Sequence, residues 1–301
     1  MKQYLEVFVM VAEKKNFSRA AEELHMTQPA VSQYIRALEE SMGTRLLERS
    51  NKYVRLNKAG EIVFHYAKEI LGLYVKMQNS VDDLINKATG SIIIGASYTF
   101  GEYILPHIIA QLQQNYPEIT PSIQIHNTKE IIELVLDHQL DVGFIEGNLK
   151  NEHLTSEVIL EDEMFIVASP KHPLFKMQKE ICISDLDKET WILREIGSGT
   201  REATENFFRM HKLNPKRLRE FGSTQLIKES VEAGLGITLL SRWAIEKELT
   251  NHSIEIINVK GLPFKRDFSM ITNTPYQIKA LKTFIDTLHH YLANQQNFLE
   301  R

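Results

Sequence analysis

Residues 17–43 read FSRAAEELHMTQPAVSQYIRALEESMG, and this stretch carries the pattern that decides the fold of the N-terminal region. We expect two short helices, over residues 18–25 and 28–40, because apolar side chains recur in each at helical spacing. Ser18 and Thr27 stand where these helices need an N-cap. Two helices joined by so brief a turn predict a helix-turn-helix, with the second helix as the recognition element.

The second helix of this pair has two faces of opposite character. Val31, Ile35 and Leu38 form a stripe that we expect to be buried. The face opposite the stripe consists of four polar side chains: Gln28, Ser32, Gln33 and Arg36. Short hydrogen-bonding groups and a cation suit base edges and phosphates, so this face is the candidate reading surface.

A hairpin with a polar turn is expected over residues 46–56, directly after the helix pair. From Arg49 to Gly60 every charged residue is basic. Residues 1–60 contain ten Lys or Arg and seven Asp or Glu, a net charge of +3; since the whole chain carries −4, residues 61–301 carry −7. A basic segment on an acidic chain indicates a local contact with a polyanion.

A basic hairpin beside a helix-turn-helix is a wing, whose cations can enter a minor groove or hold phosphate. The residues expected to contact DNA are the polar and basic ones of both elements: Ser18, Arg19, Thr27, Gln28, Pro29, Ser32, Gln33, Arg36, Arg49, Lys52 and Arg55. The alternative is a three-helix packing domain whose charged outer faces are only solvated.

Together these segments resemble the DNA-binding half of LysR-type transcriptional regulators. The matching positions are 17–24, 27–32, 35, 38–39, 43, 46–49 and 56–60. Two positions depart from the family pattern, because Leu47 stands where Phe is common and Asn57 where Thr is common. Leu47 keeps an apolar anchor and Asn57 keeps a helix N-cap, so the resemblance implies DNA binding despite both changes.

A long helix is expected after Asn57, because the chain then lacks proline as far as Gly90. Its apolar seam alternates spacings of three and four residues: Val63, Tyr66, Ile70, Leu73, Met77, Ser80 and Leu84. About thirty helical residues span about 45 Å, too long for the small N-terminal domain to cover. We therefore expect the helix to pair with a second copy, the alternative being packing on the next domain. In the resembled family this linker helix joins two subunits.

From Ser91 onward, β-rich runs alternate with helical segments, which predicts βαβ units and a largely parallel sheet. Strands are expected at 91–96, 121–126, 141–146, 164–168, 189–193, 237–240, 254–259 and 268–272. Helices are expected near 102–116, 129–138, 200–212, 224–234, 241–249 and 275–295.

The resemblance implies that this C-terminal region is a two-lobed effector domain like a periplasmic binding protein. The expected fold class is therefore multidomain α+β: a winged helix-turn-helix (1–58), a linker helix (59–89) and a two-lobed α/β effector domain (90–301). The lobes divide into about 90–162 with 267–301, and about 163–266.

Ligands of open α/β sheets bind beyond the carboxyl ends of strands, near helix N-termini. Three segments lie between an expected strand and an expected helix in this way: 97–101, 127–128 and 197–201. Glu146 ends another expected strand, where its carboxylate can receive an ammonium group. The residues expected to bind an effector are Ser97, Tyr98, Thr99, Phe100, Asn127, Thr128, Glu146, Ser198, Gly199, Thr200, Arg201 and Gln225. The alternative for each of them is an ordinary helix cap.

The sequence lacks the motifs that mark several classes of enzyme. It contains no nucleophile elbow, P-loop or HExxH pattern, and the Gly234–Gly236 pair precedes a strand instead of a helix. We therefore expect no enzyme, no cofactor and no metal. Cys182 is the single cysteine, which excludes an intrachain disulfide and fits a reducing cytoplasm. A run of about 18 apolar residues is absent, so no membrane span is expected.

The expected function is a cytoplasmic, ligand-responsive regulator that binds double-stranded promoter DNA with dyad symmetry and a small anionic or amino-acid-like effector. The resemblance implies a homotetramer built from two homodimers, with RNA polymerase as a further partner. Residues 101–106, 197–202 and 227–229 resemble the CysL-type branch of the family, which is tied to sulfur assimilation. The alternative is a small-molecule-binding α/β protein or enzyme whose N-terminal region serves only dimerisation.

Overall fold

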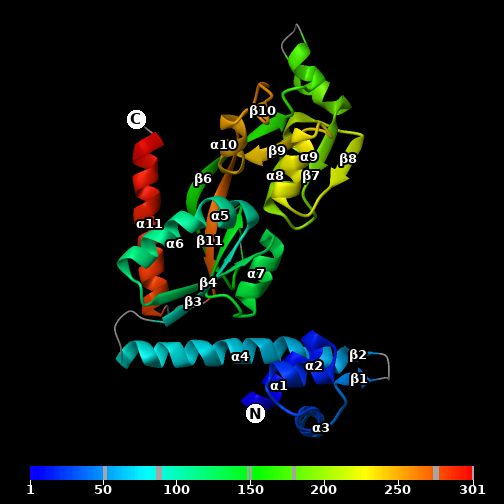
Figure 1. Ribbon diagram of the computed structural model, residues 1–301, viewed down its shortest axis with the longest axis vertical. Helices are drawn as coiled ribbons and strands as arrows, with labels where there is room; N and C mark the ends of the chain where they lie inside the picture. Colours follow the sequence, from blue (N-terminus) through cyan, green and yellow to red (C-terminus); the bar gives the residue numbers. More distant parts are fainter. Residues whose placement is uncertain are drawn as a thin grey trace. The chain divides into compact units, whose positions relative to one another are not determined.

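The computed structural model describes residues 1–49, 53–85, 90–147, 149, 151–177, 181–273 and 278–299. The chain divides into two compact units, Met1–Ile85 with Asp137–Gln139, and Asn86–Leu136 with Leu140–Arg301 (Figure 1). Among the described residues, no helix has both the length and the apolar character that crossing a membrane requires.

The N-terminal unit is built from four helices and a short hairpin. Its elements are α1 (Lys2–Lys14), α2 (Phe17–Glu23), α3 (Gln28–Met42), β1 (Leu47–Arg49), β2 (Val54–Leu56) and α4 (Lys58–Ile85). Phe8 of α1, Ala20 of α2 and Ile35 of α3 are fully buried in one core. The predicted helix-turn-helix is therefore present, with α1 packed against both of its helices.

The N-caps of the helix pair differ in how well the sequence predicted them. Thr27 caps α3, because its hydroxyl accepts a hydrogen bond from the backbone N–H of Ala30 at 3.4 Å. Ser18 is not the cap of α2: Asn16 is, and its side chain accepts the N–H groups of Ser18 and Arg19 at 2.9 and 3.1 Å. Asparagine is as good an N-cap as serine, so α2 starts earlier than expected and includes Phe17.

The register of the wing places a buried leucine opposite a half-buried one. Leu47 of β1 pairs with Leu56 of β2 in an antiparallel ladder. Asn57 then caps α4, since its side chain accepts the N–H of Gly60 at 2.8 Å. The predicted N-cap at this position is confirmed.

The second unit contains a mixed sheet and a small parallel sheet. The mixed sheet comprises β3 (Gly90–Ala96), β4 (Ile119–Ile125), β5 (Val142–Glu146), β6 (Thr155–Ala168), β9 (Thr238–Ser241), β10 (Glu255–Ile256) and β11 (Phe264–Thr272). The order is β10-β6-β11-β5-β3-β4, with β9 also on β6. The small sheet pairs β7 (Thr190–Leu193) with β8 (Arg217–Glu220). Among the described strands, β3 is parallel to β4 and β5, and β7 is parallel to β8, whereas β6 and β11 form long antiparallel pairs. The expectation of a largely parallel sheet is therefore wrong for the larger sheet, which is mixed.

The helices of the second unit mostly follow the expected ranges. They are α5 (Tyr98–Tyr103), α6 (Leu105–Asn115), α7 (Thr128–Leu136), α8 (Gly199–His211), α9 (Thr224–Glu232), α10 (Arg242–Thr250) and α11 (Lys279–Leu299), with 3₁₀ turns at Pro173–Lys176 and Ile183–Lys188. The single helix expected near 102–116 is instead α5 followed by α6. The break falls at Ile104, because Pro106 can occupy only the first turn of a helix.

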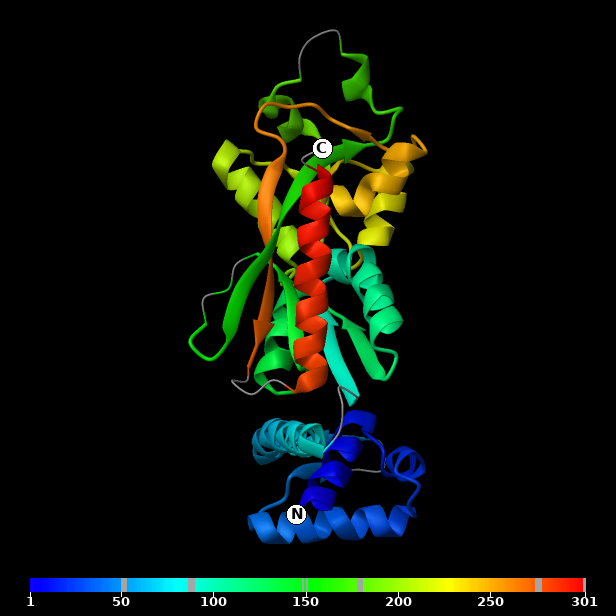
Figure 2. The same ribbon diagram turned by 90° about the vertical axis from the view of Figure 1, so that its left-hand side faces the viewer.

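Two lobes are visible in this unit (Figures 1 and 2). The first lobe contains β3, β4, β5, α5, α6, α7 and α11, and its core includes Phe100, Phe144 and Phe284. The second lobe contains β7, β8, β9, α8, α9 and α10, with Trp191 and Phe207 in its core. Strands β6 and β11 run through both lobes, since residues of each pack in both cores.

Candidate functional sites

The polar face of α3 is open to solvent, as the sequence predicts. Gln28, Gln33 and Arg36 are exposed and Ser32 is half-buried. The amide of Gln28 donates to the hydroxyl of Ser32 at 3.0 Å, and Arg36 pairs with Glu40 at 3.0 Å while its side chain remains 80% exposed. Both side chains are thus held in place by contacts weak enough to exchange for base edges or phosphates.

The wing presents two arginines in different states. Arg55 pairs with Glu48 at 2.6 Å, its side chain is 65% exposed, and this bond raises the pKa of the guanidinium. Arg49 pairs with the less exposed Glu39 at 3.0 Å and lies over the ring of Phe17 at 4.7 Å. Arg55 is therefore the more available of the two cations.

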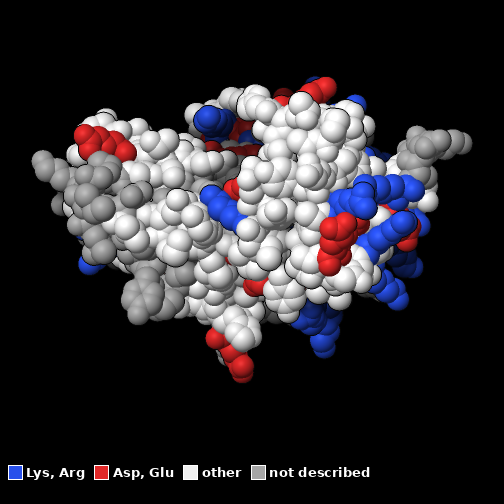
Figure 3. Space-filling view, turned by 90° about the horizontal axis from the view of Figure 1, so that it is seen from below, with Lys and Arg blue, Asp and Glu red and all other residues white. Residues whose placement is uncertain are grey.

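A hollow of about 1200 Å³ separates α3 from the wing. Its lining includes Ser32, Arg36, Arg45, Arg49 and Tyr53. Figure 3 shows Lys and Arg side chains gathered, with some Asp and Glu, toward the right-hand side of this view. A convex polyanion that fills the hollow would meet side chains of both elements at once.

The remaining predicted DNA contacts lie around the start of the helix pair. Ser18, Arg19, Thr27 and Pro29 are exposed on α2, on α3 or in the turn between them. Lys52 lies outside the described residues.

A buried polar network joins the two lobes of the second unit. Arg266 of β11 donates to Glu146 of β5 at 2.6 Å and to Asp162 of β6 at 2.7 Å. It also donates to the hydroxyls of Thr99 and Thr200 at 3.3 and 3.1 Å. The side chain of Arg266 is 5% exposed, so the whole charge is held by protein groups.

Glu146 is the carboxylate at the centre of this network. It accepts the N–H of Thr99 from the first lobe at 3.3 Å and the hydroxyl of Thr200 from the second lobe at 2.8 Å. Burial acts to raise the pKa of Glu146, but the charge of Arg266 and the bonds from Thr99 and Thr200 outweigh it and lower the pKa. For Asp162 burial prevails and raises the pKa. Glu146 is thus ionised and already holds a cation of this chain, so it receives an external ammonium group only if Arg266 withdraws.

The structure brings many of the predicted ligand residues to this place. Gly199 lies against Glu146 and Thr128, and the hydroxyl of Thr128 accepts the N–H of Glu146 at 3.4 Å. Ser97 is 2% exposed, and its hydroxyl has no hydrogen-bond partner among the described residues. Ser198, the N-cap of α8, makes no capping side-chain bond. A small polar ligand would therefore find hydroxyl groups from both lobes here.

Other predicted ligand residues lie apart from the network. Phe100 is fully buried against Phe144 in the first-lobe core. Asn127 caps α7 by accepting the N–H of Glu130 at 3.0 Å. Arg201 pairs with acidic groups of its own lobe, and Gln225 is exposed on α9, bonded to Glu229. A surface hollow of about 310 Å³ adjoins the network, since its lining includes Thr128 and Ser198 as well as Arg201.

Two residues of the site were missed by the sequence argument. Arg194 follows β7 directly, lies over the ring of Tyr98 at 4.2 Å and donates to Thr224 at 3.1 Å. Its place after a strand is the signal that would have found it. Arg266 lies within a strand between two charged neighbours, and that pattern gives no sign of burial.

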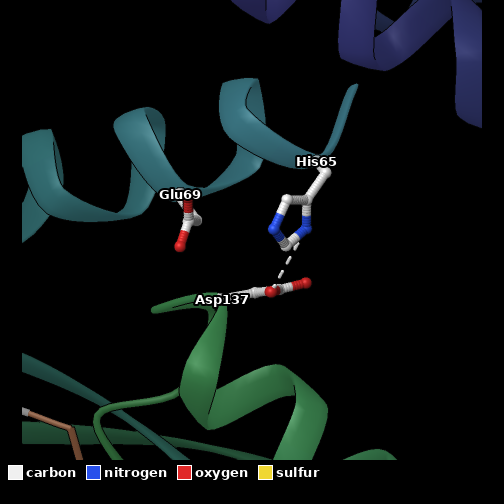
Figure 4. A group of neighbouring side chains, drawn as sticks. All are labelled: His65, Glu69 and Asp137. Atoms are coloured by element: carbon white, nitrogen blue, oxygen red, sulfur yellow. Dashed lines mark ion pairs between the residues drawn. The ribbon is translucent and has the colours of Figure 1, made fainter. Parts of the chain in front are cut away.

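Among the described residues, a cluster of side chains that could ligate a metal lies beside α4, outside both candidate sites. His65 and Glu69 of α4 and Asp137 have ligand-type atoms within 4.8 Å of one another, and His65 faces Asp137 at 3.5 Å (Figure 4). Partly exposed groups of this kind are common without an ion, so the cluster by itself carries no metal assignment.

Comparisons with known proteins cover nearly the whole chain. Residues 3–61 match the family "Bacterial regulatory helix-turn-helix protein, lysR family", and residues 86–293 match the "LysR substrate binding domain". The HTH-type transcriptional regulator CysL of Bacillus subtilis is 41% identical over 267 residues, 89% of each chain.

Solved structures show the same architecture. CbnR in complex with its target DNA superposes with a TM-score of 0.72 at 21% identity, over 96% of this chain and 99% of that one. The regulatory domain of CcmR from Synechocystis PCC6803, in complex with 2-PG, gives a TM-score of 0.61 at 26% identity, over 68% of this chain and 99% of that one.

A winged helix-turn-helix, a long helix and a two-lobed α/β unit define a DNA-binding regulator with an effector-binding domain. The chain belongs to the LysR family of transcriptional regulators.

Proposed function

We propose that α3 enters the major groove of a dyad-symmetric promoter site while the wing holds the flanking backbone. The observation that carries this proposal is the hollow between α3 and the wing, whose lining includes Arg36 of α3 and Arg49 of the wing. Arg55, on the strand paired with that of Arg49, is the more exposed cation of the wing. Residues 1–58 form the reading head in this proposal, 59–89 the linker, and 90–301 the effector domain, with lobes that divide near Asp162 and Asp267.

The DNA-binding test compares an Arg36→Glu/Arg55→Glu variant with the wild type on duplexes selected from a random pool by the wild-type protein. We expect affinity to fall about 100-fold and the slope of log Kd against log salt to decrease by about 2, because each cation neutralises one phosphate. Arg209→Glu, which reverses an exposed charge on α8, is the control and should leave the affinity and the salt slope unchanged. If the wild type selects no duplex, or the double variant binds normally, the proposal is wrong.

We also propose that α4 pairs two copies of the chain. Six apolar side chains on it are about half exposed or more and fall within one stripe of helix surface: Ile62, Tyr66, Ile70, Leu73, Met77 and Val81. Val63 of the expected seam instead packs against the N-terminal core, and the side chains of Ser80 and Leu84 lie outside those described. Assembly of two dimers into a tetramer and contact with RNA polymerase belong to the same proposal.

The pairing test is a Leu73→Glu/Met77→Glu variant. Two carboxylates in the stripe would have to be desolvated on pairing, so we expect sedimentation to give the 34.8 kDa monomer at micromolar concentration, with DNA affinity lost in parallel. Gln78→Glu adds a charge beside Met77 but off the stripe, and it should leave the assembly intact. An unchanged mass for the double variant would contradict pairing through α4.

We further propose that a small polar or anionic effector binds beside the Glu146–Arg266 network. Two observations support this: the Ser97 hydroxyl has no partner among the described residues, and Thr99 and Thr200 bring hydroxyls from both lobes. The 2-PG complex of CcmR agrees with such a ligand. The resemblance to the CysL-type branch adds sulfur metabolites and amino acids to the candidates, and the 41% identity to CysL supports that resemblance. The regulator can bind DNA in two conformations of its oligomer. A ligand with different affinities for these two conformations would change the DNA footprint.

The effector test is a thermal-shift screen of sulfate, thiosulfate, O-acetylserine, 2-PG and the common amino acids. A ligand at 100 times its Kd adds about 2.7 kcal/mol, which raises the Tm by roughly 5–10 °C. The shift should disappear in Thr200→Val and persist in Thr250→Val, whose hydroxyl bonds only to its own helix. A shift that survives Thr200→Val would place the ligand elsewhere.

A further inference from the structure

Glu39 of α3 faces the wing instead of solvent. Its side chain is 13% exposed, whereas that of the next residue, Glu40, is 67% exposed. One carboxylate oxygen accepts the backbone N–H groups of Leu46 and Leu47 at 2.9 and 3.2 Å. The other accepts a guanidinium N–H of Arg49 at 3.0 Å. A single side chain of the recognition helix thus holds three positions of the wing.

These bonds meet a requirement of the backbone at the start of the wing. The chain leaves α3 through Gly43, which has a φ of 68°, and enters β1 with Leu46 and Leu47 buried. Two consecutive N–H groups at buried residues need acceptors, and a carboxylate is a strong one. The backbone at Leu46 is also bonded from the far side, since its carbonyl accepts the N–H of Asn57 at 3.1 Å. Glu39 and Asn57 therefore fix the base of the wing between them.

The contact with Arg49 extends this attachment to α2. The Arg49 guanidinium lies between the carboxylate of Glu39 and the ring of Phe17, which is 4.7 Å from it. Helix α2, helix α3 and strand β1 therefore meet at Arg49. A cation held in this way braces the wing, and Arg55 on the paired strand is left as the exposed wing cation.

We propose that Glu39 is a positioning residue for DNA binding, which fixes the distance between the recognition helix and the wing. The proposal rests on the proposed function, because both elements must then engage one duplex together. With the wing fixed, its contact with phosphate costs no ordering of the hairpin when DNA binds. Without Glu39, the helix and the wing bind as two loosely joined elements, and the contribution of Arg55 declines.

The experiment is a double-mutant cycle between Glu39 and Arg55, two residues that bond to different partners. On duplexes selected by the wild type, we expect Arg55→Ala to weaken binding about tenfold in the wild-type background. In the Glu39→Ala background the same change should weaken it less than about threefold. Glu40→Ala is the matched control, since Glu40 is adjacent and its partner is on its own helix; there, Arg55→Ala should again cost about tenfold.

Two further measurements separate positioning from simple loss of folding. Glu39→Gln keeps a neutral acceptor for Leu46 and Leu47, so it should restore much of the coupling that Glu39→Ala loses. In Glu39→Ala, hydroxyl-radical protection should fade at the flanking phosphates and persist where α3 binds, with the variant folded by circular dichroism at the assay temperature. Equal costs of Arg55→Ala in all backgrounds, or full flanking protection in Glu39→Ala, would overturn the proposal. If the wild type binds no duplex, the proposed function fails first.

Discussion

Replacing Arg266 with methionine should lower the Tm of the second unit by roughly 10 °C. The change removes the cation between Glu146 and Asp162, whose side chains are 2% and 0% exposed, and leaves two buried carboxylates with hydrogen bonds but no opposite charge. Breaking a buried pair in this way costs about 3–5 kcal/mol, and each kcal/mol shifts the Tm of a unit this size by roughly 2–4 °C. Differential scanning calorimetry of the full chain measures the effect.

The dependence on pH distinguishes this mechanism from a packing defect. In the variant, the charge that most opposes the effect of burial at Glu146 is gone, so the pKa of Glu146 in the folded state should lie above that in the unfolded state. Stability then rises as pH falls from about 7 to about 5, because the folded state binds the extra protons, and the Tm deficit should narrow. Lys265→Met, which breaks only the exposed pair with Glu161, should change the Tm little at either pH. A deficit independent of pH would refute the electrostatic account.

Replacing Gly199 with alanine should abolish the response to effector while leaving DNA binding intact. Gly199 begins α8 in the second lobe, and a Cβ there would lie 2.7 Å from the carbonyl oxygen of Glu146 and 2.9 Å from the hydroxyl of Thr128. Both atoms belong to the first lobe, and the first is backbone, which cannot rotate away. The added methyl therefore holds the lobes apart and lengthens the Thr200–Glu146 hydrogen bond, now 2.8 Å.

The measurement is the effector-induced Tm shift together with the DNA footprint, for any ligand that the screen identifies. Gly222→Ala is the control, because a Cβ at Gly222 would meet no atom within 4 Å. We expect Gly222→Ala to respond as the wild type does and Gly199→Ala to show neither the shift nor the altered footprint. A normal response in Gly199→Ala would mean that close apposition of the lobes is not needed for effector binding.

The reading head was predictable because its signals are local. The apolar spacing of α3, the cap at Thr27 and the Gly43 terminus all lie within one stretch of chain, and the structure has each of them. The expected cap at Ser18 was wrong because two good N-cap residues, Asn16 and Ser18, lie two positions apart and either can start the helix.

The ligand site was predictable only in part, for a different reason. The sequence predicted four hydroxyl residues of this site, because residues at strand ends and helix starts gather at one edge of a sheet. They are Ser97, Thr99, Thr128 and Thr200. Arg266 was not found, because it pairs with Glu146 across 120 residues and its neighbours, Lys265 and Asp267, make the segment look solvent-facing. Long-range charge pairing of this kind leaves no local periodicity.

The same limit applies to two strands. The first half of β6, Thr155–Glu163, carries four acidic residues, and β8 is Arg-Leu-Arg-Glu with every residue exposed. Pairing with β11 and β7 stabilises these strands, because this half of β6 buries only Leu160 and Asp162 and β8 buries no side chain. The hydrophobic pattern therefore gave no signal for either.

The ladder between β6 and β11 has one irregular step, where Phe268 pairs with Leu160 and Ser269 with Val158, so that Ile159 is skipped. Such a bulge bends a two-stranded ribbon and increases its twist at one place. Arg266 lies two residues away on the same strand, in register with Asp162. The bulge, where the ribbon bends, therefore lies next to Arg266, whose ion pairs link β11 to β5 and β6. We expect any bending of one lobe against the other to strain the ion pairs of Arg266 directly, so that lobe motion and charge rearrangement occur as a single event.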